Sequence, residues 1–209
     1  MVKTIPTLSA IAVVAFSTAV GAQGTNAERP GTKVGDSWTY SFHDTRYSRP
    51  ASSYTETVES VTADKITATW KNHDLGKSGT DVFDRDMGNL SSQGYRIRAY
   101  DFPLTVGKTW TFEYDASSGD KSWHHKVTGK VVGLEKVTVP AGTFNTAKVE
   151  LTDYYNGSAN GGWTWSGVVT DTRWYSPQVR NYVRRTFVDS GSSSSAPVIR
   201  ELLKYSVRK

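Results

Sequence analysis

Hydrophobic and polar residues alternate along much of the chain, most clearly in two matching stretches. The first runs from Val34 to Phe42 and the second from Val106 to Tyr114, and both read V-G-x-x-W-T-aromatic-x-aromatic. Since successive side chains of a strand point to opposite faces, each stretch predicts a strand with one aromatic and one polar face. Large aromatic side chains on one strand face usually serve burial, so we expect core packing, with a ligand cavity as the alternative.

Period-two alternation continues towards the end of the chain. Beyond the two matching strands, the expected strands span residues 54–61, 66–71, 81–84, 95–101, 121–132, 137–139, 144–153, 163–174, 181–188 and 199–207. The last of these also fits a helical stripe, but no long segment has a convincing helical period. The pattern predicts an all-β fold with a single curved antiparallel sheet, a half-barrel or open barrel of roughly 10–12 strands. The matching stretches predict either a duplicated β-meander or two ends of that sheet.

The first residues have the pattern of an export signal. Lys3 is followed by the mostly apolar run 8–20, which is too short to span a bilayer, and then by small residues up to Ala22. We therefore expect a signal peptide over 1–22, a flexible leader over 23–32 and a single β-rich domain over 33–209, located in the periplasm or secreted. No later stretch is apolar enough for a transmembrane segment.

The composition says more about the fold of the protein than about its function. The chain of 209 residues contains no cysteine, so the exported domain must be held together by its core rather than by disulfides, and no cysteine can carry a lipid. The net charge of +5 is modest and gives no indication of a nucleic-acid partner. Seven tryptophans and eleven tyrosines are typical of an aromatic core or an aromatic-lined pocket.

Motifs for catalysis and metal binding give little support to an enzyme. His124 and His125 are adjacent, so on a strand they point to opposite faces and cannot both bind one metal ion without distortion, which leaves only a site assembled from distant strands. Residues 81–89 look superficially like a calcium loop but lack its spacing, which favours a turn with solvated acids. There is no nucleophile elbow, phosphate loop or dinucleotide fingerprint. We predict no catalytic residue, metal or cofactor.

Two stretches carry candidate ligand-binding residues. Trp163 and Trp165 share one strand face beside a glycine-rich loop and could stack on a sugar ring or a lipid tail, with core packing as the alternative. The second stretch spans residues 173–180, with Trp174 and Tyr175 as candidates, and is followed by Arg184 and Arg185. If it forms a strand, Arg180, Tyr182 and Arg184 share one face, and the two arginines could hold an anionic group. The alternative is a solvated sheet edge whose cations discourage edge pairing.

Short motifs resemble those of secreted bacterial β-rich families of unknown function. Residues 139–149 read V-P-A-G-T-F-N-T-A-K-V, which resembles a hairpin of such families, and residues 174–180 resemble the strand and turn that follow. The resemblance implies a curved antiparallel sheet similar to the half-barrel of periplasmic lipoprotein carriers. These motifs describe turns and packing, so they carry over no catalytic residue.

These observations together predict an exported, non-catalytic β-protein that binds an apolar or amphipathic ligand on the concave, aromatic-lined side of its sheet. A lipid-like small molecule is the expected partner. One alternative is an interaction or scaffold protein whose partner is another envelope protein. The other is a hydrolase of polysaccharide or ester, which a cleft with two facing carboxylates would favour.

Overall fold

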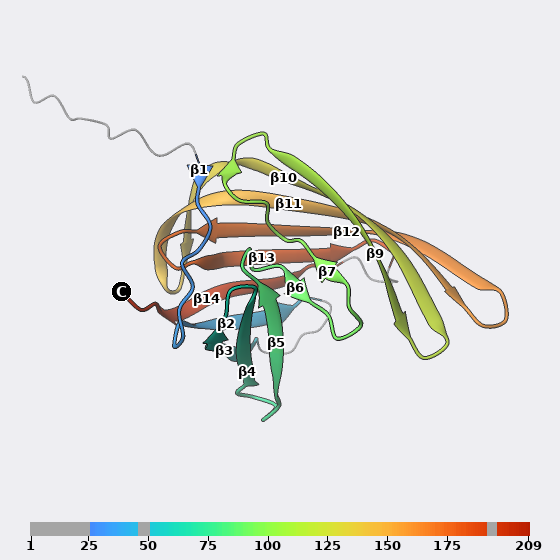
Figure 1. Cartoon of the computed structure of the whole chain (residues 1–209), viewed down its shortest axis with the longest axis horizontal. Helices are drawn as coiled ribbons and strands as arrows, with labels where there is room; N and C mark the ends of the chain where they lie inside the picture. The colour runs from blue at the N-terminus through green and yellow to red at the C-terminus, as the bar shows by residue number, and fades with distance from the viewer. Residues whose placement is uncertain (1–25, 46–50, 192–195) are drawn as a thin grey trace, which may run out of the picture.

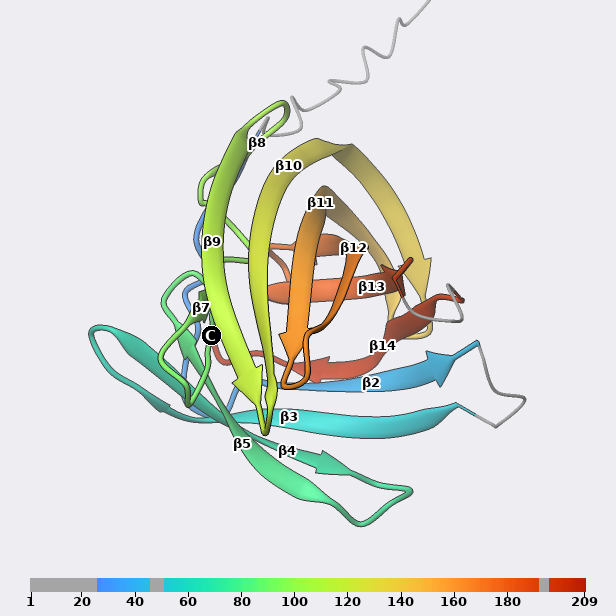
Figure 2. The same ribbon diagram turned by 90° about the vertical axis from the view of Figure 1, so that its right-hand side faces the viewer.

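The computed structural model describes residues 26–45, 51–191 and 196–209, and every regular element in these ranges is a β-strand. The predicted signal peptide lies outside the described residues. Figures 1 and 2 show strands that curl around a common axis. The strands are β1 (Asn26–Ala27), β2 (Ser37–Asp44), β3 (Ser52–Val61), β4 (Lys65–Asn72), β5 (Ser78–Asp84), β6 (Asn89–Leu90), β7 (Arg96–Ile97), β8 (Leu104–Thr105), β9 (Thr109–Ser118), β10 (Lys121–Val139), β11 (Gly142–Ala159), β12 (Trp163–Ser176), β13 (Asn181–Asp189) and β14 (Val198–Ser206).

Twelve of these strands form one antiparallel sheet, so the predicted all-β curved sheet is confirmed. Its order is β7-β6-β5-β4-β3-β2-β14-β13-β12-β11-β10-β9, while β1 pairs only with β8. The chain thus makes two meanders, β2 to β7 and β9 to β14, joined where the first strand of one pairs with the last strand of the other. The sheet curls into a nearly closed barrel with β7 and β9 at its two edges.

The sequence repeat is also a repeat of local structure. Gly35 and Gly107 both have a positive φ (85° and 87°), which glycine adopts without strain. Their amides donate equivalent hydrogen bonds, to the carbonyl of Val58 at 2.8 Å and to that of Val131 at 2.9 Å. A register shift follows each acceptor, in the β3–β4 and the β10–β11 ladders. The duplicated start of a meander is therefore present, and the two copies lie in different parts of one sheet.

The tryptophans of the repeat pack in the core, as predicted. Trp38 is completely buried and donates a hydrogen bond of 2.7 Å from Nε1 to the carbonyl of Val179. Trp110 is 6% exposed and donates a bond of 3.0 Å to the carbonyl of Arg98. Each indole thus satisfies its one polar group while burying a large apolar surface, which ties a strand to a distant turn or loop.

Three tryptophans lie flat against a glycine directly opposite on the neighbouring strand. The pairs are Trp70 with Gly79, Trp110 with Gly129, and Trp165 with Gly157. A Cβ atom placed on any of these glycines would come within 2.1 to 2.7 Å of the facing indole. The missing side chain is therefore what allows each ring to lie on the backbone.

Two of the longest strands continue past the positions where the sequence pattern predicts their ends. Residues 121–139 form one strand, although the sequence predicts separate strands at 121–132 and 137–139. The shift in register at Val131–Gly133 absorbs the irregularity as a bulge, so the ladder with β11 resumes. β11 likewise extends through residues expected to be a loop, because both its neighbours pair with it as far as Ala159. As a result, the ends of β9 to β12 project beyond the rest of the sheet (Figure 1).

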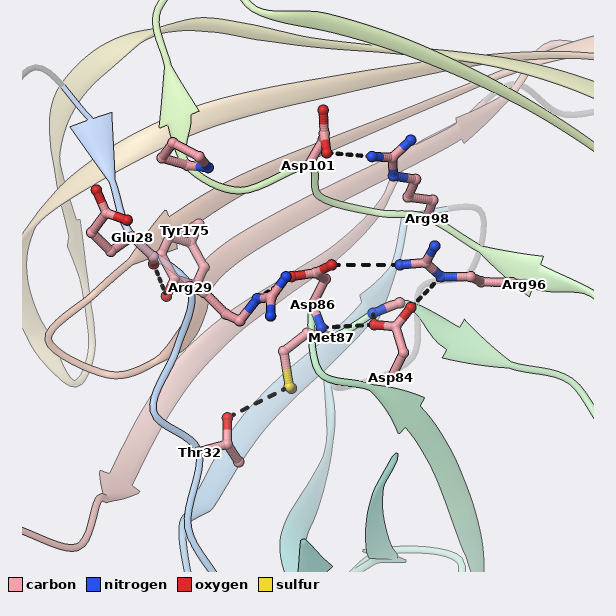
Figure 3. Close-up of polar contacts among 12 residues, drawn as sticks. Glu28, Arg29, Thr32, Asp84, Asp86, Met87, Arg96, Arg98, Asp101 and Tyr175 are labelled. Carbon is pink, nitrogen blue, oxygen red and sulfur yellow. Dashed lines mark hydrogen bonds and ion pairs between the residues drawn. The ribbon is translucent and has the colours of Figure 1, made fainter. Parts of the chain in front are cut away.

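The described part of the expected leader is paired and packed rather than free. β1 pairs with β8, and Ala27, Pro30 and Thr32 are buried. Figure 3 shows this segment crossing beside the turn after β5, where Thr32 donates a hydrogen bond of 3.8 Å to the sulfur of Met87. Residues 26–32 therefore belong to the folded domain, because their apolar side chains complete its core.

The stretch with a superficial likeness to a calcium loop contains the predicted turn, but its Asp84 and Asp86 are ion-paired and mostly buried rather than solvated as expected. Oδ1 of Asp84 accepts hydrogen bonds of 2.8 Å from the amides of Asp86 and Gly88. Arg96 pairs with Asp84, and Arg29 pairs with Asp86 at 2.6 Å, as Figure 3 shows. The carboxylates thus hold the turn and anchor the N-terminal segment.

Candidate functional site

Three hollow spaces meet at a single arginine on the concave side of the sheet. The interior cavity, of about 260 Å³, lies inside the curl of the sheet and has both aromatic and charged walls. The Trp70 cleft, of about 390 Å³, runs over β2 to β5, and the Phe187 groove, of about 230 Å³, lies beside β13 and β14. Arg200 lines all three spaces, and Glu56 and Asp81 line both the interior cavity and the Trp70 cleft.

Arg200 is held by aromatic rings rather than by a carboxylate. It lies on β14 opposite Phe42, with its guanidinium 5.5 Å from the centroid of the Phe42 ring and 5.4 Å from that of Tyr54. Its Nη1 donates a hydrogen bond of 3.3 Å to the Tyr54 hydroxyl. Within the ranges that the structure describes, Arg200 forms no ion pair. A guanidinium has five N–H donors, so this side chain keeps donors for another acceptor.

Two carboxyl groups face the same space, and neither has a hydrogen-bond partner among the described residues. Glu56 on β3 is only 9% exposed. Burial raises the pKa of Glu56 to about 7, the charge of Asp81 adds to the rise, and Arg200 opposes it. Burial also raises the pKa of Asp81, on β5, while Arg200 again opposes the rise. These are the properties of carboxyl groups that lack a cation close enough to pair with them.

The interior cavity also contains a cluster of charged residues, Asp171, Arg173 and Arg185, that are paired with one another. Nε and Nη2 of Arg185 donate to the two oxygens of Asp171 at 2.7 and 2.8 Å, and Arg173 donates to Asp171 Oδ2 at 2.8 Å. Burial alone would raise the pKa of Asp171, but the two guanidinium groups hold it well below its ordinary value. This cluster fixes β12 and β13 to each other and shapes the cavity wall.

Asp153, which lines the interior cavity, pairs with a histidine. Nδ1 of His125 lies 2.8 Å from Oδ2 of Asp153, and its ring stacks on Tyr114 with centroids 4.3 Å apart. His124 lies on the opposite face beside Asp115, as adjacent strand residues were expected to do. Within the described ranges, no three histidine or acidic side chains gather as a metal-ligand set.

The six residues proposed from the sequence as ligand contacts do not form one site, although Trp174 and Arg184 are in contact, and none of the six lines these three spaces. Trp163 is 75% exposed near a hairpin end, and Trp165 packs edge-on against Trp123 there, with ring centroids 5.8 Å apart. Tyr175 is completely buried and donates a 3.3 Å hydrogen bond to the carbonyl of Glu28.

The arginines among the six have partners elsewhere. Arg180 lies in the turn before β13 and pairs with Asp36 at 2.9 Å. Arg184 pairs with Glu201 at 2.7 Å and lies over the ring of Trp174. The two do not share a strand face with Tyr182, because Arg180 precedes the strand and the β12–β13 register shifts between the partners of Tyr182 and Arg184.

Sequence reasoning missed Arg200, Glu56 and Asp81, although the sequence contained a signal for Glu56. Tyr54, Glu56 and Val58 alternate on one face of β3, and Val58 is 1% exposed. A carboxylate at an inward position of an otherwise apolar alternation is costly to bury and so marks a candidate site. The other two charges meet it only through the strand order, which brings β14 and β5 to either side of β2–β4.

The geometry defines a class of protein in which a nearly closed antiparallel β-sheet surrounds a partly charged hollow. Comparison with known proteins finds a solved structure with the same fold. No family model and no curated protein matches the chain. A candidate lipoprotein of Parabacteroides distasonis is similar in structure, with a TM-score of 0.53 and 16% identity over 86% of this chain and 99% of that one. At this identity the likeness shows the fold alone, and it confirms the resemblance to exported bacterial β-proteins at that level.

Two further solved structures were found at lower similarity. A candidate exported protein of Bacteroides fragilis with a YmcC-like fold has a TM-score of 0.48 and 15% identity, covering 86% of this chain and 99% of that one. The hypothetical lipoprotein YmcC of Escherichia coli has a TM-score of 0.41 and 13% identity, covering 81% and 84%. In the described part of this chain, no helix has the length and apolarity needed to cross a membrane.

Proposed function

We propose that this protein is an exported, non-catalytic binding protein that holds a small amphipathic ligand in the hollow of its sheet. The polar end of the ligand lies at Arg200, and its apolar end lies in the interior cavity. The export proposal rests on the signal-like pattern of the first 22 residues, and the name of the solved structure of this fold from Parabacteroides distasonis, a candidate lipoprotein, agrees with it.

The observation that carries the binding proposal is the shared position of Arg200. One charged side chain with free donors lies where three hollow spaces meet, and two of its neighbours are aromatic rings. The interior cavity also has apolar walls, to which Phe83, Val127 and Leu151 contribute. A largely pre-formed hollow with apolar walls and a few polar groups is the usual form of a small-ligand site.

The test fills the interior cavity and measures binding of amphiphiles. Val169 lines the interior cavity from β12, whereas the adjacent Val168 points to the other face of the same strand. We expect Val169→Trp to abolish binding of decyl-chain amphiphiles in calorimetric titrations below their micelle concentrations, and Val168→Trp to leave it intact. Equal binding by both variants would place the ligand elsewhere, and a wild-type protein that binds no amphiphile would refute the proposal.

One observation favours a second candidate function, hydrolysis of a glycoside or ester. Glu56 and Asp81 face one space, and burial raises the pKa of both, which is the condition for a carboxyl group to act as a general acid. Turnover of chromogenic glycosides or esters that is lost in both Glu56→Gln and Asp81→Asn would favour this candidate. Binding without turnover would favour the non-catalytic binding protein.

A further inference from the structure

We propose that the polar group recognised at this site is zwitterionic: its anionic part binds Arg200, and its cationic part lies over Trp70 between Glu56 and Asp81. This inference rests on the proposed function and names the class of head group that the amphiphile carries. Phosphocholine, phosphoethanolamine and betaine groups share this chemistry, a fixed positive and a fixed negative charge a few bonds apart.

Charged side chains of both signs line the interior cavity and the Trp70 cleft without pairing to each other. Arg200 reaches from β14, Glu56 from β3 and Asp81 from β5, and none of the three forms an ion pair within the described ranges. Buried polar groups are normally hydrogen-bonded, and a buried charge without a partner is expensive. A ligand with one charge would satisfy one sign and be repelled by the other, whereas a zwitterion satisfies both.

Trp70 supplies a flat aromatic surface next to the two carboxyl groups. It lines the cleft, and one face of its ring lies against Gly79, where a Cβ would be 2.7 Å from Cζ2. Trp70 lies on β4 directly between Glu56 on one side and Gly79 on the other. Tryptophan is the best aromatic partner for a cation, and carboxylates beside the ring strengthen the attraction to an ammonium group. The other aromatic rings of the cleft, those of Phe42 and Tyr54, already contact the guanidinium of Arg200.

The other arginines of the interior cavity fit this role less well. Arg173 and Arg185 share Asp171, and their hydrogen bonds to it orient both guanidinium groups towards β12 and β13. An anion there would compete with a buried carboxylate that is already bonded to both guanidinium groups. Arg200 lacks such a competitor, so it is the stronger site for an external anion.

The experiment compares head groups on one chain length. Decylphosphocholine, decyl sulfate and decyltrimethylammonium are titrated below their micelle concentrations, together with phosphocholine that has no chain. We expect the zwitterion to bind about tenfold more tightly than either singly charged amphiphile. Arg200→Gln should bring its affinity down to that of the trimethylammonium compound, and Glu56→Gln down to that of the sulfate.

Trp70→Ala should weaken binding of the zwitterion and the trimethylammonium compound about fivefold, without affecting decyl sulfate. Trp165→Ala is the matched control, because Trp165 lies on Gly157 in the same manner but outside the three spaces. Unaltered folding of each variant is checked by its circular dichroism and melting curve. An equal effect of the two tryptophan variants would overturn the assignment of the cation to Trp70.

Proton release gives a second readout. A ligand cation is attracted to ionised Glu56, whose pKa in the free protein is about 7, so affinity for the zwitterion should rise as pH increases through 7 and a proton should be released on binding. The charged groups that face Glu56 are Asp81 and Arg200, and Tyr40 and Tyr54 pack beside it with pKa values raised further by burial. Glu56→Gln should remove this pH dependence.

The outcomes separate the two proposals. Amphiphiles that bind with no preference among head groups would overturn the zwitterion assignment and leave the binding function standing. Failure of every decyl compound to bind would overturn both. Phosphocholine that binds as tightly as its decyl derivative would support the charge assignment and identify a solute, rather than a lipid, as its source.

Discussion

The flat packing of Trp110 on Gly129 makes a quantitative prediction about stability. In Gly129→Ala the new methyl carbon would lie 2.2 Å from Cε2 of Trp110, so the indole must move. Displacement endangers the hydrogen bond from Trp110 to the carbonyl of Arg98, worth about 1 kcal/mol, and overpacking of this kind costs about 1–3 kcal/mol more. We therefore expect a loss of about 2–4 kcal/mol in the free energy of unfolding, equivalent to roughly 10 °C in Tm.

Gly133 on the same strand provides the control. A Cβ at Gly133 meets nothing within 4 Å, and its φ does not require glycine, so Gly133→Ala should be neutral or stabilise by up to about 1 kcal/mol. Urea unfolding followed by circular dichroism measures both variants on the same scale. If Gly129→Ala changed the unfolding free energy by less than about 0.5 kcal/mol, or if both variants destabilised equally, the steric reasoning would be refuted.

Three further predictions follow from charge and exposure. Asp171→Asn should cost about 3–5 kcal/mol in urea unfolding, because it leaves Arg173 and Arg185 buried without their carboxylate. Since the folded-state pKa of Asp171 is depressed, its stabilisation is present above about pH 4 and is lost on acidification. The pKa of Glu56 is raised to about 7, so between about pH 4.5 and 7 its contribution should reduce the free energy of unfolding by about 3 kcal/mol as pH rises, a slope that Glu56→Gln removes. Trp163→Ala should change the melting temperature by less than about 2 °C, because the side chain is largely exposed.

Alternation along single strands predicted the fold, because burial of one strand face leaves a local trace in the sequence. Trp38, Tyr40 and Trp110 show this directly, and the last strand was predicted over almost the residues that form it. The continuation of β10 through Gly133 was not predictable, because it depends on the ladder that β11 provides.

The candidate site was harder to predict, for a physical reason. Its charged residues come from β3, β5 and β14, no two of which are adjacent in the sheet, so neither a spacing in the chain nor a single strand pairing connects them. The tryptophans proposed from the sequence were chosen because they lie close together in a glycine-rich stretch. However, Trp165 and Trp70 both pack on a glycine of the neighbouring strand and differ only in the residues beside them. Local patterns record how a side chain packs, and the function of a site depends on which strands become neighbours.

The pairing of β2 with β14 sets the order in which the sheet can be completed. Each meander is built from hairpins, whose contacts are close in sequence and therefore form quickly. The junction between the meanders is different: the Ser41 hydroxyl donates to the carbonyl of Glu201, 160 residues further along the chain. Closing so long a loop costs more conformational entropy than closing a hairpin, and the hydrogen bonds of the β2–β14 ladder offset that cost. The interior cavity is lined by residues of both meanders, so its walls come together only when β2 pairs with β14.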